Sequence, residues 1–135
     1  MSEAASDKVA RGEGWSAAHL DDLGEGPGFR KIRPALGVTA FGVNAIVLPP
    51  GYATGMHFHD EQEELYFVHS GRVAIEFGDG SVEELEPGGL AWVDAPTPRR
   101  LRNLSESEEA VYVCVGGKDG YVGRDGKLVD GETHR

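Results

Sequence analysis

The chain has a single cysteine, Cys114, among its 135 residues. One cysteine excludes a disulfide within the chain, so the fold must be stabilised by burial of apolar surface rather than by cross-links. A lone cysteine is most often a small buried apolar side chain, and we expect that role for Cys114. The low cysteine content is compatible with a reducing compartment, and we expect a cytoplasmic protein.

Long apolar runs and basic residues are also scarce. No segment approaches the ~20 apolar residues needed to cross a membrane, and the N-terminal part lacks the apolar stretch typical of a signal peptide. Lys and Arg together number 13 against 23 Asp and Glu, which gives a formal net charge of -10. Such a charge repels phosphate backbones and anionic lipid, so we expect neither nucleic acid nor membranes as partners.

Amphipathic segments of helix length are missing as well, whereas glycine is abundant, with 20 residues. From residue 29 onward, short runs rich in Val, Ile, Leu, Phe and Tyr alternate with turn residues, as in NAIVLPPG, ELYFVHSG and RVAIEFGDG. Short, evenly spaced strands without helices between them are typical of antiparallel sandwiches and barrels. The sequence therefore predicts one all-β domain.

The apolar pattern divides the chain into three parts. Residues 1–28 are small and polar and are expected to form a partly mobile N-terminal arm, in which Ser16 could cap a helical turn or two. Residues 29–117 form the predicted β-barrel. Residues 118–135 form a polar, glycine-rich C-terminal tail that could hold one hairpin around 124–126 and otherwise exposes its charges to solvent.

The densest cluster of potential metal ligands lies in GYATGMHFHDEQEELYFVHSG, residues 51–71. If MHFH is extended, His57 and His59 project from the same face of the strand. The polar residues that follow suit a hairpin connection, and Glu64 on the next strand can then face the two histidines. Two imidazoles and a carboxylate suit Fe, Mn, Ni, Zn and Cu, so these three residues are a candidate site for a divalent transition metal of open identity.

The same stretch resembles the first motif of the cupin superfamily, G-x5-H-x-H-x(3,4)-E-x6-G. Every fixed position is matched, by Gly51, His57, His59, Glu64 and Gly71. The resemblance implies a small single-domain cupin with a double-stranded β-helix, the jelly-roll barrel of this superfamily. It also implies that the two histidines and the glutamate bind a metal inside the barrel, and it covers roughly residues 29–117.

The second cupin motif, G-x5-P-x-G-x2-H-x3-N, matches less well. It runs from Gly88 to Asn103 with both ends matching, but Arg99 stands where the family carries its fourth metal ligand, a histidine. Arginine cannot bind a metal because its guanidinium stays protonated. Two arrangements remain open. In the first, a metal sits on the three other ligands and Arg99 holds an anionic substrate group. In the second, Arg99 pairs with Glu64 and this ion pair replaces the metal.

The alternation of side chains along a strand predicts which face each neighbouring residue occupies. Tyr66 shares the parity of Glu64 and is a candidate substrate-binding residue, although an aromatic at such a position is more often part of the core. Arg99 and Leu101 share one face of their strand, so the other two arginines of the cluster, Arg100 and Arg102, should face solvent beside acidic strands. Three further expectations concern single residues: His69 facing away from the site, Asn103 bonding at a strand end, and Trp92 packing in the pocket or core.

Fold does not give function, because cupin barrels serve dioxygenases, isomerases, epimerases, decarboxylases, storage proteins and sensory domains. The pocket favours a metal-dependent enzyme, of oxidoreductase, dioxygenase or isomerase type, that acts on a small anionic substrate without an organic cofactor. The alternative is a non-enzymatic small-molecule binding or sensing module with a degenerate or absent metal site. Small cupins usually resemble dimers, so we also expect a homodimer, to which residues 1–28 could contribute an exchanged arm.

Overall fold

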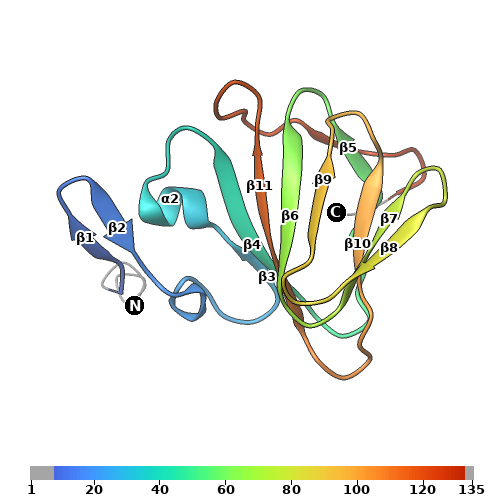
Figure 1. Ribbon diagram of the computed structural model, residues 1–135, viewed down its shortest axis with the longest axis horizontal. Helices are drawn as coiled ribbons and strands as arrows, with labels where there is room; N and C mark the ends of the chain where they lie inside the picture. Colours follow the sequence, from blue (N-terminus) through green and yellow to red (C-terminus); the bar gives the residue numbers. More distant parts are fainter. Residues whose placement is uncertain (1–7, 133–135) are drawn as a thin grey trace.

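Two five-stranded antiparallel sheets face each other in the computed structural model, which describes residues 8–132 (Figure 1). In spatial order the first sheet contains β3 (Gly28–Arg30), β4 (Gly42–Leu48), β11 (Ala110–Gly117), β6 (Glu63–Ser70) and β9 (Leu90–Val93). The second contains β12 (Gly126–Leu128), β5 (His57–His59), β10 (Arg99–Asn103), β7 (Val73–Phe77) and β8 (Val82–Leu85). From β4 onward the chain passes back and forth between the sheets, which confirms the predicted double-stranded β-helix.

Alternate side chains of each strand point into the barrel, where apolar residues of both sheets meet. On β6, Tyr66 and Val68 are buried while the residues between and beside them are exposed. Val68 packs with Leu48, Ile75 and Leu101, and each of these side chains is at most 1% exposed. Burying one such side chain contributes about 1.5–3 kcal/mol, so this cluster is a main source of the barrel's stability.

The arginine cluster on β10 divides between the two faces of its sheet, as predicted. Arg99 is 0% exposed, and the buried Leu101 shares its face. Arg100 and Arg102 form ion pairs with the carboxylate of Glu76 on β7, at 3.1 and 2.9 Å. Such partly exposed pairs contribute only about 0–1 kcal/mol each. Asn103, at the end of β10, donates its side-chain amide to backbone carbonyls at neighbouring strand ends, which confirms its expected structural role.

Gly71, the last residue of the histidine-containing motif, forms the turn from β6 to β7. Its φ of 78° is left-handed, and a Cβ at this position would lie 2.8 Å from Ala110 on β11. A side chain would therefore be strained and would also collide with the neighbouring strand. The motif requires glycine here because β6 must turn directly into β7 beside β11.

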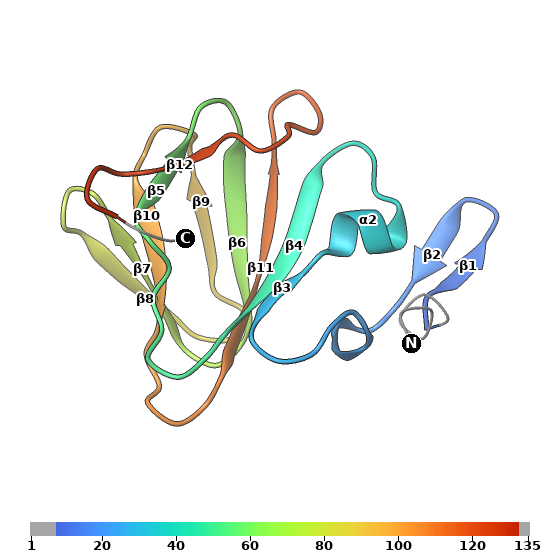
Figure 2. The same ribbon diagram turned by 180° about the vertical axis from the view of Figure 1, so that it is seen from behind.

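The N-terminal segment differs from the expected arm with a helical turn. Strands β1 (Ala10–Gly12) and β2 (Trp15–Ala17) form a hairpin that stands away from the barrel (Figure 2). Ser16, the expected helix cap, lies within β2, and its hydroxyl donates to the carbonyl of Leu36 at 2.7 Å. The helical turn expected after Ser16 is present only as the 3-10 helix η1 (Leu20–Asp22), whose N-cap is His19 and not Ser16. Gly14, with a φ of 83°, turns the chain from β1 into β2.

Two short helical segments follow the hairpin. These are the 3-10 helix η1 (Leu20–Asp22) and the α-helix α2 (Ile32–Leu36), which packs against β4. Within residues 8–132, no helix is long and apolar enough to cross a membrane. Part of the arm predicted to be mobile, residues 1–7, lies outside the described residues.

The predicted polar tail contributes a strand to the barrel. β12 pairs antiparallel with β5 and places Gly126 opposite His59 and Leu128 opposite His57. The hairpin expected around residues 124–126 is therefore wrong, because this segment pairs with a distant strand rather than with itself. The edge of the histidine-bearing strand is covered by backbone hydrogen bonds as a result.

Candidate functional site

A cavity of about 810 Å³ lies within the barrel, between the inner faces of β4, β5, β6 and β11. Segments before α2 and before β12 complete its wall. Polar side chains gather on one side of it, namely His57, His59, Gln62, Glu64 and Tyr66. Cys114 on β11 also lines the cavity, and burial raises the pKa of its thiol well above the ordinary value. This cysteine is therefore a protonated, weakly polar wall residue, as expected.

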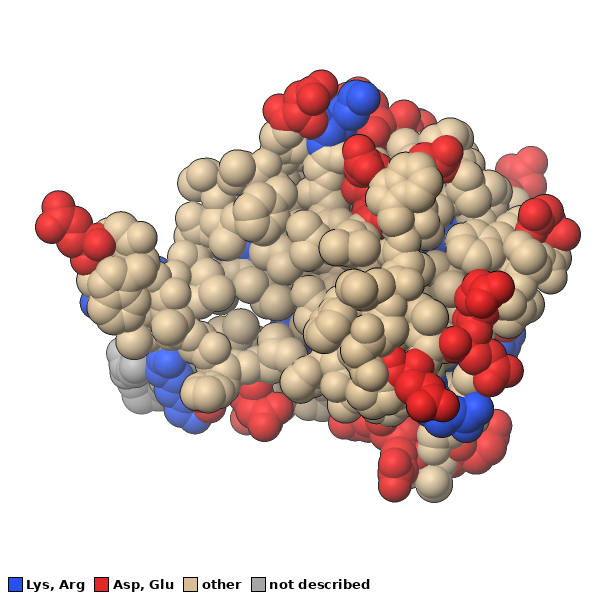
Figure 3. All heavy atoms as spheres, in the orientation of Figure 1, with Lys and Arg blue, Asp and Glu red and all other residues tan. Residues whose placement is uncertain are grey.

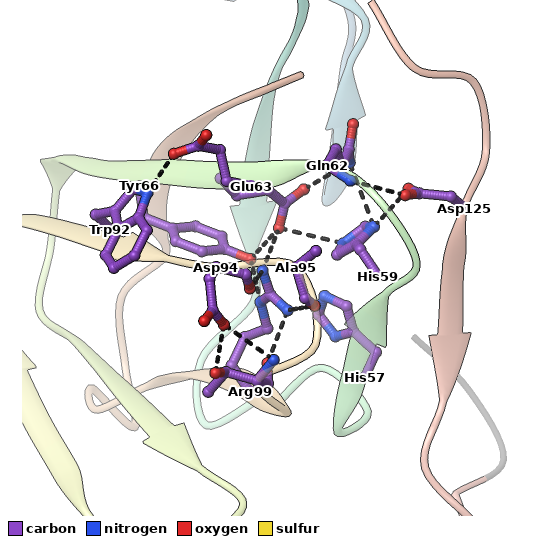
Figure 4. A network of polar contacts seen from close by, with 12 residues as sticks. His57, His59, Gln62, Glu63, Tyr66, Trp92, Asp94, Ala95, Arg99 and Asp125 are labelled. Atoms are coloured by element: carbon purple, nitrogen blue, oxygen red, sulfur yellow. Dashed lines mark hydrogen bonds and ion pairs between the residues drawn. The ribbon is translucent and has the colours of Figure 1, made fainter. Parts of the chain in front are cut away.

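The three residues predicted as metal ligands converge on this side of the cavity. Figure 4 shows the two histidines within their network of polar contacts. His57 and His59 come from β5 and Glu64 from β6, and all three are buried. One ligand atom from each lies within 4.8 Å of the others. The imidazole centroids are 5.5 Å apart with the rings at 80°, so the two nitrogens approach the centre from different directions. The spacing that predicted this cluster therefore brings its members together.

Each imidazole uses its Nδ1 atom for a contact that fixes the ring. Nδ1 of His57 lies 3.0 Å from the carbonyl of Gly55, and Nδ1 of His59 lies 2.8 Å from Oδ1 of Asp125. Because both partners are acceptors, Nδ1 carries the proton in each neutral ring and Nε2 carries the lone pair. This is the orientation that a metal-binding histidine needs, with a carbonyl or carboxylate behind the ring.

The Nε2 atom of His59 gives a direct test of whether a metal fits. It is buried and has no hydrogen-bond partner within residues 8–132. Oε1 of Glu64 lies 3.2 Å away, so the carboxylate contacts this nitrogen as an ion pair. A buried nitrogen without a partner is costly, and a cation placed between it and the carboxylate would satisfy both groups. The donor set therefore fits a divalent transition metal.

The charges of His59 and Glu64 depend on each other. Burial would raise the pKa of Glu64, but His59, the hydroxyl of Tyr66 and the charge of Arg99 outweigh burial and lower the pKa to about 2. Burial would lower the pKa of His59, but Glu64 and Asp125 outweigh it and raise the pKa above its ordinary value. A proton on His59 and a metal at this site would therefore compete for the same buried group.

Arg99 lies beside this cluster, directly opposite His57 in the β5–β10 pair. Its Nη atoms donate to three backbone carbonyls of the loop before β10, those of Asp94, Ala95 and Thr97. Its Nη2 atom is also 3.5 Å from Oε1 of Glu64, and its Nε donates to the hydroxyl of Tyr66 at 3.2 Å. The guanidinium is thus surrounded by protein oxygens and is not among the groups that line the cavity.

Tyr66 links Arg99 to Glu64. Its hydroxyl accepts from Arg99 Nε and donates a short hydrogen bond to Oε1 of Glu64. The side chain is 2% exposed, and burial raises the pKa of its hydroxyl well above the ordinary value, so it stays protonated. The predicted inward orientation of Tyr66 is confirmed, and its contacts orient the Glu64 carboxylate. Its role in substrate binding stays a prediction.

Two residues of this network were not predicted from the sequence. Asp125, in the C-terminal segment, accepts from His59 through Oδ1 and from the backbone N–H groups of Glu61 and Gln62 through Oδ2. Gln62 in turn donates its side-chain amide to Oε2 of Glu64 at 3.1 Å. The sequence signal for Asp125 was one Asp-Gly turn, which says nothing about a partner 66 residues away.

The outer face of β6 and β9 contradicts one expectation. Trp92 is 62% exposed on β9, so its predicted place in the pocket or core is wrong. It lies opposite Leu65, and Leu90 lies opposite Phe67, so four large apolar side chains share this outer face. Figure 3 shows the corresponding face as largely uncharged and bordered by acidic side chains. His69, in contrast, is exposed as predicted.

Comparison with known proteins supports the interpretation of the fold. Residues 45–116 match the family described as Cupin domain. A search among curated proteins found no significant match. Among solved structures, the chain is similar to a sugar phosphate isomerase from a cupin superfamily of Silicibacter pomeroyi, with 24% identity and a TM-score of 0.63 over 94% of this chain and 69% of that protein.

Two further solved structures share the fold. DMSP lyases match with 27% identity and a TM-score of 0.58, over 67% of this chain and 44% of that chain. An uncharacterized conserved protein with a double-stranded beta-helix domain from Klebsiella pneumoniae matches with 21% identity and a TM-score of 0.59, over 67% of this chain and 76% of that one. The chain therefore spans less than half the length of the lyase chain that it resembles.

Replacing Asp125 with Asn should weaken metal binding without removing a ligand. An amide no longer offers His59 a negative charge behind its ring, and loss of such a partner typically costs 10–100-fold in metal affinity. Competition with a chromophoric chelator would measure the loss, with Asp130→Asn, an exposed change in the same segment, as control. Equal affinities for the two variants, both shown to be folded by circular dichroism, would exclude this role for Asp125.

Proposed function

The chain belongs to the cupin domain family, and we propose that it is a metal-dependent enzyme that acts on a small anionic molecule in its barrel. One observation carries the proposal: Nε2 of His59 is buried without a hydrogen-bond partner in the described part of the chain, within 4.8 Å of ligand atoms of His57 and Glu64. Three ligands of this type are typical of catalytic metal sites, which keep further positions open for substrate.

Each residue of the site has a distinct role in the proposed enzyme. His57, His59 and Glu64 would hold the metal, which when bound would supply a Lewis acid for the substrate. Gln62 and Tyr66 fix the two oxygens of the Glu64 carboxylate, so that its position is set before any ligand arrives. The apolar walls of the cavity, from β4 and β11, exclude water and strengthen the charges inside.

Four acidic groups of the cavity are poorly placed for proton transfer. The carboxylates of Glu64 and Asp125 already accept hydrogen bonds, and the hydroxyl of Tyr66 and the thiol of Cys114 are held in their protonated forms. The two histidines remain as candidate proton carriers, and a bound metal would supply a Lewis acid. The similarity to DMSP lyases supports a small-molecule substrate and no specific reaction.

A second candidate is a non-enzymatic module that binds a small molecule without metal. The ion pair of 3.5 Å between Arg99 and Glu64 favours it, because the guanidinium already compensates the carboxylate. A guanidinium about 5 Å from a divalent cation would also oppose binding by on the order of 6 kcal/mol at an effective dielectric constant of about 20. The strength of metal binding decides between the two functions.

Metal analysis of protein purified without chelators tests the enzyme proposal. We expect close to one equivalent per chain after reloading with one of Fe, Mn, Ni, Cu or Zn, and at least a tenfold weaker affinity in Glu64→Gln. The matched control is Glu63→Gln, since Glu63 is exposed and faces away from the site. Substoichiometric uptake of every metal, together with small-molecule binding that EDTA leaves unchanged, would instead establish the binding module.

Replacing Arg99 with His tests whether residue 99 occupies the position of the fourth metal ligand in the second cupin motif. The variant would remove a positive charge and place a third imidazole, as a fourth ligand, opposite His57, so metal affinity should rise at least tenfold. Arg99→Met removes the charge without adding a ligand, so it measures the electrostatic contribution of Arg99 to metal affinity separately. Both variants should lose stability, because the loop carbonyls of residues 94–97 lose their donor. If Arg99→His binds metal no better than Arg99→Met in chelator competition, residue 99 does not occupy the ligand position.

The expected homodimer can form through the outer face of β6 and β9. Leu65, Phe67, Leu90 and Trp92 are between 39% and 62% exposed there, and a contiguous apolar face of this kind is typical of association surfaces. We expect light scattering to give a dimer at micromolar concentration, and Leu90→Glu to give a monomer. Val82→Glu, a similarly exposed position on the other sheet, is the control. A monomeric unmodified protein would contradict this interface.

A further inference from the structure

Three basic side chains line the cavity at the end formed by α2 and the segment before β12. They are Lys31, Arg33 and Arg124. No carboxylate of residues 8–132 forms an ion pair with any of the three; the ion pairs of the described chain involve other cations. In a chain with a formal net charge of -10, three uncompensated cations around one cavity are unexpected on composition alone. They outnumber the two carboxylates of the cavity wall, Glu64 and Asp125, and so favour an anion at this end of the cavity.

Arg33 is held in place at this wall. Its Cζ atom lies 3.5 Å from the centroid of the Tyr121 ring, so the guanidinium stacks on the aromatic face. Tyr121 in turn lies beside the backbone of Gly42 on β4, and all three residues border the cavity. The Nε atom of Arg33 is buried and lacks a hydrogen-bond partner in the described chain. The stacked guanidinium is a fixed planar cation, and its terminal nitrogen atoms are the donors that can meet a carboxylate or phosphate in the cavity.

We propose that Arg33, supported by Arg124 and Lys31, is a subsite for the anionic end of the substrate. The inference deepens the proposed function, on which it rests, by assigning substrate charge to this wall and not to Arg99. The guanidinium of Arg99 is fully buried and occupied by protein oxygens. The substrate would then span the cavity, with a carboxylate or phosphate at Arg33 and its reactive group at the histidine pair.

Calorimetric titration with malonate and with inorganic phosphate tests the subsite in both metal-free and metal-loaded protein. Arg33→Met keeps much of the apolar stem but removes the charge, and should weaken binding of the preferred anion about tenfold or more. Arg33→Lys should retain part of the affinity. Arg72→Met, an exposed arginine that pairs with Glu84 far from the cavity, is the control and should change nothing. The preferred anion identifies carboxylate or phosphate as the recognised group.

The possible outcomes separate this subsite from the metal site. Arg33-dependent anion binding in protein that takes up no metal would support the subsite and reject the enzyme proposal. Anion binding that requires metal and is equal in Arg33→Met and the unmodified protein would reject the subsite and leave the enzyme proposal standing. Binding of neither anion would also overturn the subsite. If Arg33→Met does not fold, Arg124→Gln replaces it as the test variant. We expect Arg124→Gln to bind the preferred anion at least threefold more weakly. An unchanged anion affinity in this variant would count against the proposal.

Discussion

The buried negative charge of Glu64 is the constraint on which the interior of the barrel depends. Glu64 is 8% exposed, and an ionised carboxylate at that depth is costly unless other groups compensate it. Compensation comes from four side chains, those of His59, Gln62, Tyr66 and Arg99. The short connection that crosses from β5 in one sheet to β6 in the other, the parity of β6 and the loop before β10 are all needed to bring these groups to one carboxylate.

Competition between positive charges follows from this arrangement. A proton on His59, the guanidinium of Arg99 and a bound metal all compensate the same carboxylate, and only the proton can leave when metal binds. Arg99 stays because its other donors are held by backbone carbonyls. A metal held at this site would therefore bind more weakly and exchange more readily than at a site with four ligands and no neighbouring cation, and the choice between the enzyme and the binding module depends on that difference.

Local regularities in the sequence were sufficient to predict the barrel and the convergence of His57, His59 and Glu64. His57 and His59 share a face because strands repeat every two residues. The expected hairpin is wrong, because β5 and β6 lie in different sheets, and the short connection between them brings Glu64 to the histidines from the facing sheet. The alternation of side chains along a strand did not predict the exposed position of Trp92. It separates the two faces of a strand without indicating which face is buried. Asp125 and Arg33 could not be found at all, since their roles depend on pairings between β12 and β5 and between α2 and Tyr121 that no local period encodes.

The pairing of β12 with β5 has a consequence for biosynthesis. During synthesis the ribosome releases His59 long before Asp125, which lies 66 residues further along the chain. Until that segment emerges, β5 has an open edge and the His59 imidazole lacks its carboxylate partner. A nascent chain can thus fold much of its core before it can hold a metal in the final geometry. Any metal that the three side chains bind would therefore reach its final surroundings late in maturation, after the segment with Asp125 has been synthesised.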